Sequence, residues 1–281
     1  MPLIEVHEDW LAQVQEEILE PTRRIIDPHH HFFAQTGEFP HYDLPKLRAD
    51  TASHGVQQTV YLQCWEGYRE DGPEAFKPVG ETQWVDAIAA EARKQPGSVQ
   101  IGAIMGTADL RLGGLVNEVL DAHLGASSLF RGIRQIAAWD ASDALFSMPD
   151  IHDANLYEDR AFRAGFGVLA DLGLVFDAYQ YHTQLASLTA LARAFPQVPI
   201  VLNHLGTPLG VGPYAGRREE IFGQWSRDLA AAASCPNMTI KLGGLVMPWN
   251  GFGFETHAKP PTSDEFVAAQ ARYYHYAIEQ F

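Results

Sequence analysis

Arg24-Ile25-Ile26-Asp27-Pro28-His29-His30-His31-Phe32-Phe33 carries the strongest pattern in this chain: a short apolar run ends in an acid and three histidines. We predict a buried strand over residues 24–29, in which successive side chains point to opposite faces. Asp27, His29 and His31 would then share one face at the carboxyl end of the strand, and His30 would point the other way. Two imidazoles on one face can reach a single cation, and histidine commonly binds zinc and similar metals. The alternative is a chance histidine cluster on a surface loop.

Length, charge and cysteine content exclude several classes of protein. The 281 residues fit one large α/β barrel or two ordinary domains, and 46% hydrophobic residues suffice for a sizeable core. The net charge of −15 argues against binding to nucleic acid or to an anionic membrane, because both favour basic surfaces. Cys64 and Cys235 form neither a disulfide framework nor a metal-binding pattern, and Cys64 lies in an apolar run that indicates burial.

Neither the N-terminal segment nor any apolar run indicates export or membrane insertion. Residues 1–20 are acidic and lack an apolar core segment, so we expect no signal peptide. No window approaches eighteen uninterrupted apolar residues, so we expect no membrane span. The expected location is therefore a reducing cytoplasm. The expected partner is a small-molecule substrate, with no nucleic acid and no membrane, and a homo-oligomer is compatible with the sequence.

Short apolar segments alternate with amphipathic segments along the whole chain. We predict strands over residues 24–29, 58–64, 99–105, 130–136, 174–179, 198–203 and 238–242. We predict helices over residues 8–19, 44–54, 81–94, 112–124, 158–172, 185–195, 217–234 and 262–281. Such alternation predicts a parallel sheet, and the first strand lacks the glycine-rich turn of a dinucleotide-binding domain. Polar residues follow the strands, where barrel active sites are built. We therefore predict one α/β domain over residues 1–281, a TIM-type (β/α) barrel with about seven β/α units and a short N-terminal helix.

Two motifs together resemble the amidohydrolase superfamily: Asp27-Pro28-His29-His30-His31 on the first predicted strand and Asn203-His204-Leu205-Gly206 after the sixth. The likeness is closer to its branch of TIM-barrel metal-dependent hydrolases, which includes sugar-lactone and pyrone-dicarboxylate lactonases. Three supporting pieces follow in the family's order: Phe130-Arg131-Gly132-Ile133-Arg134-Gln135, Phe176-Asp177 and Lys241-Leu242-Gly243-Gly244. That family has an eighth strand that ends in an acid. The sequence stops before one, so we expect a C-terminally incomplete barrel whose first and seventh strands have open edges.

The resemblance implies hydrolysis assisted by a divalent metal, zinc or manganese. Such a metal polarises a carbonyl group and lowers the pKa of its bound water to about 7. His29 and His31 are the expected ligands. The resemblance adds His182 after the fifth strand as a further ligand, with substrate contact or an ordinary loop position as alternatives. Asp27 is a further oxygen donor or an acid that supports the ligands. Some related lactonases work without a metal, with the same histidines as oxyanion donors, so a metal-free mechanism stays open.

Four other side chains are candidates for catalysis or for substrate binding. The resemblance gives His204 the role of base or oxyanion donor, and a loop histidine is the alternative. Arg131 and Arg134 lie three residues apart on one strand and so face opposite sides. Arg134, nearer the carboxyl end, is the better candidate to bind a substrate carboxylate, with an ion pair in the barrel wall as the alternative. Lys241 is a similar candidate on the seventh strand, or else a solvated or paired lysine.

Aromatic residues also gather after several predicted strands. They suit sugar or aromatic rings at a barrel mouth, or they pack loops: Trp65, Tyr68, Trp139, Tyr181 and Trp249. We expect a hydrolase that opens a lactone of a sugar acid or of a small carboxylated ring. One alternative is a decarboxylase on the same scaffold, which would release carbon dioxide. The other is a barrel that binds without catalysis, because the acid of the eighth strand is absent.

Overall fold

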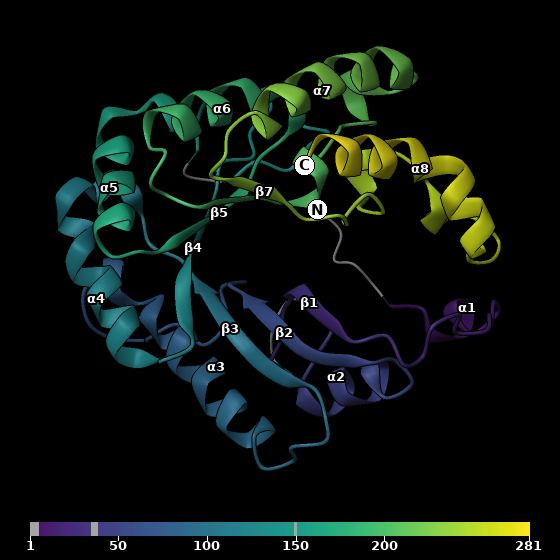
Figure 1. Cartoon of the computed structure of the whole chain (residues 1–281), viewed down its shortest axis with the longest axis horizontal. Coiled ribbons are helices and arrows are strands. Elements are labelled where there is room, and N and C mark those ends of the chain that lie inside the picture. Colours follow the sequence, from purple (N-terminus) through teal and green to yellow (C-terminus); the bar gives the residue numbers. More distant parts are fainter. Residues whose placement is uncertain (1–5, 35–38, 149–150) are drawn as a thin grey trace. The chain divides into compact units, whose positions relative to one another are not determined.

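The computed structural model describes residues 6–34, 39–148 and 151–281, which form two compact units. Unit 1 consists mainly of Glu16–Asp109 and Gly114–Arg134. Unit 2 consists of His7–Gln15, Leu110–Gly113 and Gln135–Phe281. Figure 1 shows that both units are built from strands and helices in alternation.

Unit 1 contains a parallel sheet in which the strands follow one another in chain order. The strands are β1 (Ile25–His30), β2 (Val56–Leu62), β3 (Gln100–Gly106) and β4 (Phe130–Ile136), whose last two residues belong to unit 2. The helices between them are α2 (Leu44–Thr51), α3 (Val79–Ala92) and α4 (Val116–Ala126). The core of unit 1 includes Phe32, Tyr61, Val85 and Ile104, all fully buried.

Unit 2 repeats the same alternation. Its parallel strands are β5 (Val175–Tyr179), β6 (Ile200–Leu202) and β7 (Met238–Ile240). Its helices are α1 (Glu8–Leu11), α5 (Arg160–Asp171), α6 (Leu185–Ala194), α7 (Arg218–Ala233) and α8 (Ser263–Gln280). The Asp159 side chain accepts a hydrogen bond from the Phe162 amide and so begins α5, whose buried Phe166 packs edge-on against Phe176 of β5.

The predicted alternation of strands and helices is confirmed, and seven strands lie within the described residues. The helix predicted over residues 8–19 is wrong, because α1 ends at Leu11. Leu19 is 91% exposed, so the apolar stripe on which that prediction rested buries little. The helix predicted from residue 112 begins instead at Val116, after a 3₁₀ turn in which Gly113 has a φ of +60°. The single domain over residues 1–281 stays a prediction.

Among the residues that the structure describes, no helix is both long and apolar enough to span a membrane.

Candidate functional site

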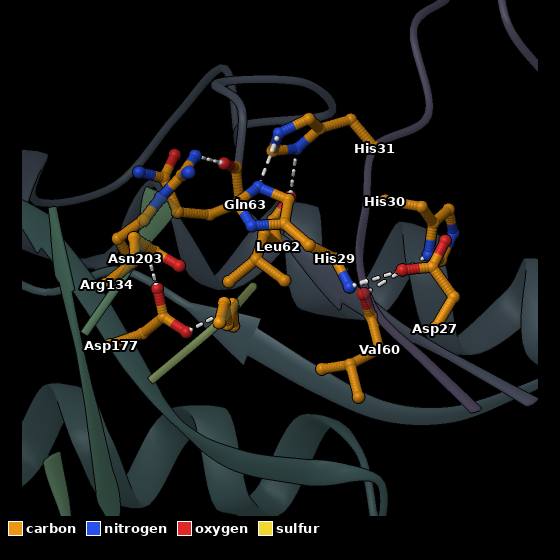
Figure 2. Close-up of polar contacts among 11 residues, drawn as sticks. Asp27, His29, His30, His31, Val60, Leu62, Gln63, Arg134, Asp177 and Asn203 are labelled. Atoms are coloured by element: carbon orange, nitrogen blue, oxygen red, sulfur yellow. Dashed lines mark hydrogen bonds and ion pairs between the residues drawn. The ribbon is translucent and has the colours of Figure 1, made fainter. Parts of the chain in front are cut away.

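The end of β1 presents two histidines on one face and one on the other, as the strand period predicts. His30 is buried, and its ring lies edge-on to those of Phe32 and Tyr61, with centroids 4.7 and 5.6 Å away. His29 and His31 turn to the opposite face, where their Nε2 atoms are 3.2 Å apart (Figure 2). The expected separation of the three histidines between two faces is therefore confirmed.

One hydrogen bond fixes the backbone of His29, and another fixes the ring of His31. The His29 amide donates to Oδ1 of Asp27 over 3.0 Å, so this carboxylate holds the backbone near the end of β1, where the register with β2 is irregular. His31 Nδ1 lies 2.7 Å from the carbonyl oxygen of Leu62 at the end of β2 (Figure 2). Because a carbonyl only accepts, we place the His31 proton on Nδ1, which leaves the Nε2 lone pair facing His29. Hydrogen bonding of the second ring nitrogen in this way is typical of histidines that bind metals.

The spacing of the two Nε2 atoms fits two ligands of one divalent metal. Nitrogen ligands at 2.0–2.1 Å from a tetrahedral zinc are about 3.3 Å apart. The observed 3.2 Å agrees with that value. Within residues 6–34, 39–148 and 151–281, however, no group of three or more His, Cys, Asp or Glu side chains is placed to hold a metal ion. His29 and His31 therefore fit as a pair of ligands, and the further ligand stays a prediction.

Arg134 of β4 is buried at the same end of the strands in unit 1. Its Nη2 donates to the carbonyl oxygen of Gln63 (Figure 2). Its Nε and the side-chain Oε1 of Gln63 are both buried and have no hydrogen-bond partner among the described residues. A guanidinium N–H and an amide oxygen without partners complement a carboxylate or a hydroxyl group on a ligand.

Arg131 faces the other way, which confirms that the two arginines lie on opposite sides of β4. It is exposed, and its Nη1 donates to the carbonyl oxygens of Ser128 and Phe130. The structure therefore gives Arg131 a local backbone role.

Sequence reasoning missed Glu81, a buried acid in the first turn of α3. Its Oε1 accepts hydrogen bonds from the Tyr61 hydroxyl at 2.7 Å, the Cys64 amide at 2.7 Å and the Glu66 amide at 3.3 Å. Burial raises its pKa to about 7, and the three hydrogen bonds oppose that rise. The available signal was its spacing of four residues from Val85, which puts Glu81 on the buried face of the helix.

Unit 2 contains a buried ion pair between a residue in the middle of β5 and the residue that follows β7. Lys241 Nζ lies 2.6 Å from Oδ2 of Asp177, and both side chains are less than 10% exposed. The side-chain amide of Asn203 donates to the other carboxylate oxygen of Asp177 (Figure 2). The paired-lysine alternative for Lys241 is therefore observed. The sequence marked Phe176-Asp177 as a motif but did not identify Asp177 as its partner.

His182 is fully buried in a 3₁₀ turn after β5. Its Nδ1 accepts a hydrogen bond from the Leu209 amide over 3.4 Å, and its ring lies edge-on to Tyr214. In the described part of the chain its Nε2 has no hydrogen-bond partner. Burial lowers its pKa to about 4, so the ring is neutral at pH 7, as a metal ligand must be. Its role as a ligand stays a prediction.

His204 lies in a strained turn after β6. His204, Leu205 and Thr207 have φ values of +51°, +54° and +49°, a region that costs roughly 1–2 kcal/mol for a residue with a side chain. The ring packs edge-on against Tyr179, and a Cβ added at Gly244 would lie 2.2 Å from its Nδ1. Gly244 thus lies against the histidine, and the space there admits only glycine.

The aromatic residues predicted to contact substrate differ in how far they are buried. Tyr181 is fully buried and its hydroxyl donates to the carbonyl oxygen of Phe146, which is the packing alternative. Trp139 and Trp249 are half-buried, and Trp249 packs against the second apolar cluster. Trp65 is 43% exposed and has a φ of +67°. Substrate contacts at Trp65 and Trp139 stay predictions.

Comparisons of sequence show one family. A family model described as "Amidohydrolase" matches residues 26–273. "Uncharacterized protein y4mH" of Sinorhizobium fredii is 28% identical over 268 residues, which are 87% of this chain and 80% of that protein. L-fucono-1,5-lactonase of Burkholderia ambifaria is 26% identical over 232 residues, which are 78% of this chain and 67% of that protein.

Solved structures of similar fold include an amidohydrolase from Burkholderia multivorans, determined with bound HEPES and again with bound zinc. Each has a TM-score of 0.67 and 19% identity, over 92% of this chain and 81% of that one. A probable 2-pyrone-4,6-dicarboxylic acid hydrolase from Acinetobacter baumannii, with citric acid bound, has a TM-score of 0.56 and 14% identity. It matches over 92% of this chain and 79% of its own. The predicted α/β fold of the TIM type is therefore confirmed.

Proposed function

Since this chain belongs to the amidohydrolase family, we propose that it hydrolyses a lactone, the cyclic ester of a sugar acid or of a small carboxylated ring. Hydrolysis is supported by the description of that family as amidohydrolases. The lactone is suggested by the relative from Burkholderia ambifaria, which is an L-fucono-1,5-lactonase. The proposal rests on one observation in this chain, the two Nε2 atoms of His29 and His31 that face each other at 3.2 Å.

His29 and His31 would hold a divalent metal through these nitrogens, and zinc is the first candidate because a solved structure of the same fold contains it. When bound, such a metal polarises the ester carbonyl and supplies a water whose pKa is about 7. The chain's own contribution is orientation. The Leu62 carbonyl keeps the proton of His31 on Nδ1, and Asp27 fixes the backbone at His29.

Arg134 and Gln63 would bind the substrate. The hydrogen bond from Arg134 Nη2 to the Gln63 carbonyl limits the rotation of the guanidinium. Its Nε can then donate to a carboxylate or ring hydroxyl, and Oε1 of Gln63 can accept from a hydroxyl. Fixing a substrate in this way lowers the entropic part of the barrier.

Several roles stay predictions. They are His204 as base or oxyanion donor, His182 as a metal ligand, a homo-oligomer and a cytoplasmic location. The decarboxylase alternative is distinguished from lactone hydrolysis by its product, which is carbon dioxide.

The test is hydrolysis of a lactone panel by the purified protein, stripped with EDTA and reloaded with zinc or manganese. The panel contains L-fucono-1,5-lactone, other sugar-acid lactones and 2-pyrone-4,6-dicarboxylate, and turnover is followed by proton release. We expect activity that falls at least 100-fold in His29→Ala and in His31→Ala. His54→Ala, which removes an exposed imidazole from unit 1, is the matched control and should keep full activity. Carbon dioxide release from carboxylated rings without lactone turnover would replace the proposal with the decarboxylase.

A further inference from the structure

Residues 61–66 comprise the last two residues of β2 and the segment that follows it. This segment contacts His31 and Arg134, which are proposed to bind the metal and the substrate. The Leu62 carbonyl accepts from His31 Nδ1, and the Gln63 carbonyl accepts from Arg134 Nη2. Both carbonyls therefore have to point in fixed directions. The backbone amide of Gln63 is tied to β3 through the carbonyl of Met105, so the segment is held on that side by the sheet itself.

Glu81 holds the same segment from the helix side. The residues on either side of Leu62 and Gln63 both donate to its Oε1: Tyr61 through its hydroxyl and Cys64 through its amide. The Glu66 amide adds a third bond to that oxygen. The Oε1 atom of Glu81 thus accepts hydrogen bonds from residues on both sides of the two carbonyls that orient His31 and Arg134.

The network also reaches the other side of His31. The Cys64 Sγ lies 3.3 Å from the Tyr61 hydroxyl and donates to the carbonyl oxygen of Phe32 over 3.2 Å. Phe32 directly follows His31 in the chain. Glu81, Tyr61 and Cys64 therefore connect α3 to the backbone just after His31 and to the residues on either side of the carbonyl that accepts its hydrogen bond.

The position of Glu81 is unusual for a group that only supports the fold. It is 1% exposed, and its Oε2 is buried without a hydrogen-bond partner in the described parts of the chain. The groups that face it are Tyr61, Cys64, the Glu66 amide and, at longer range, the charge of Arg134. A carboxyl that is buried at this cost suggests a purpose beyond packing.

We propose that Glu81 is a positioning residue: by anchoring residues 61–66 it fixes the tautomer of His31 and the direction of the Arg134 guanidinium. This inference deepens the proposed function, on which its catalytic consequence rests. The contacts themselves lie within unit 1 and can be tested without a substrate.

The test is the imidazole spectrum of the ¹⁵N-labelled protein, stripped with EDTA, at pH 8. Long-range ¹H–¹⁵N correlations distinguish a ring protonated on Nδ1 from one protonated on Nε2. Wild-type His31 should show a single Nδ1–H form. His123 serves as an internal reference of the opposite form, because its Nε2 donates to the Thr107 carbonyl.

Two substitutions of similar size separate positioning from packing. Glu81→Gln keeps an oxygen for the three donors and should leave His31 in its single form. Glu81→Met has no acceptor and should give a mixture of both His31 forms, with His123 unchanged. Glu91→Gln, at an exposed position of the same helix, is the control and should match the wild type. With an active substrate in hand, Glu81→Met should lower kcat at least tenfold and Glu81→Gln less than threefold.

An unchanged His31 form in Glu81→Met would overturn the inference, as would identical spectra for the Gln and Met variants or a matching change at His123. If Glu81→Met fails to fold, Glu81→Asp replaces it, since this variant keeps the charge but withdraws the acceptor by one methylene. A single His31 form in Glu81→Asp would then overturn the inference. An inactive wild type with the expected spectra contradicts only the proposed function.

Discussion

At His31, a single hydrogen bond determines which ring nitrogen is available to bind a metal ion. The Leu62 carbonyl accepts a hydrogen bond from Nδ1–H of His31, which leaves the His31 Nε2 lone pair facing His29, 3.2 Å from its Nε2. Alternation along β1 could be predicted from the sequence, because the period of a strand needs only the order of residues. The acceptor at Leu62 could not, since it depends on the register between β1 and β2, in which His30 pairs with Tyr61.

Glu81 makes a residue-level prediction about stability and pH. Its pKa is about 7 in the folded protein and about 4.5 in the unfolded chain, so the folded state binds more protons between these values. This contribution to stability is therefore lost as pH rises through that window. Glu81→Gln lacks the effect. Its free energy of unfolding relative to wild type should increase by on the order of 2 kcal/mol from pH 5 to pH 8.

Urea unfolding at the two pH values measures this difference. Glu91→Gln should show no such trend, because that side chain is exposed. A pH-independent difference between Glu81→Gln and wild type would show that Glu81 titrates normally.

At the level of elements, polar side chains follow strands in both units, as the sequence indicated, but their partners come from elsewhere in the chain. Asp177 on β5 pairs with Lys241, which follows β7, and Asn203 after β6 joins them. The sequence marked Asp177 and Lys241 in separate motifs. Their pairing needed the strand order, which places β6 between them.

The Asp177–Lys241 pair predicts a large and specific loss of stability. Lys241→Met leaves a buried carboxylate without its counter-charge, so the free energy of unfolding should fall by about 3–5 kcal/mol. Replacing both partners, in Asp177→Leu with Lys241→Met, should recover most of this loss. Urea unfolding of the two single variants and the double variant gives the coupling free energy. Additive single effects would contradict a direct ion pair.

For the whole molecule, the sequence predicted the class of fold well because β/α alternation is a property of the complete chain. It failed at residues 8–19, where none of the apolar residues with helical spacing is buried and Leu19 is exposed. Periodicity reports which side chains could share a face and does not supply a surface to bury them. Tyr181 was expected to contact substrate or to pack a loop because it follows a strand, and it packs in the interior, which its place in the sequence could not decide.

Three buried histidines predict that the protein loses stability in mild acid. Burial lowers the pKa values of His30, His123 and His182 to about 4. The unfolded chain therefore takes up protons between pH 6.5 and 4 that the folded protein does not, and stability falls as pH falls through this window. From pH 7 to pH 5 each histidine should lower the free energy of unfolding by roughly 2 kcal/mol. Glu81 has the opposite effect over this range and offsets the contribution of about one histidine.

The urea midpoint measured between pH 7 and pH 5 checks this expectation. His123→Gln, which cannot take up a proton, should make the dependence shallower than in the wild type. A midpoint that does not change over this range would contradict the burial of these neutral rings.

The most direct test of the proposed metal site is calorimetric titration of the EDTA-stripped protein with zinc. We predict one high-affinity equivalent that binds through Nε2 of His29 and His31. It should weaken at least 100-fold in His29→Ala and in His31→Ala, and stay unchanged in His54→Ala. Equal zinc affinity in wild type and His31→Ala would contradict the account.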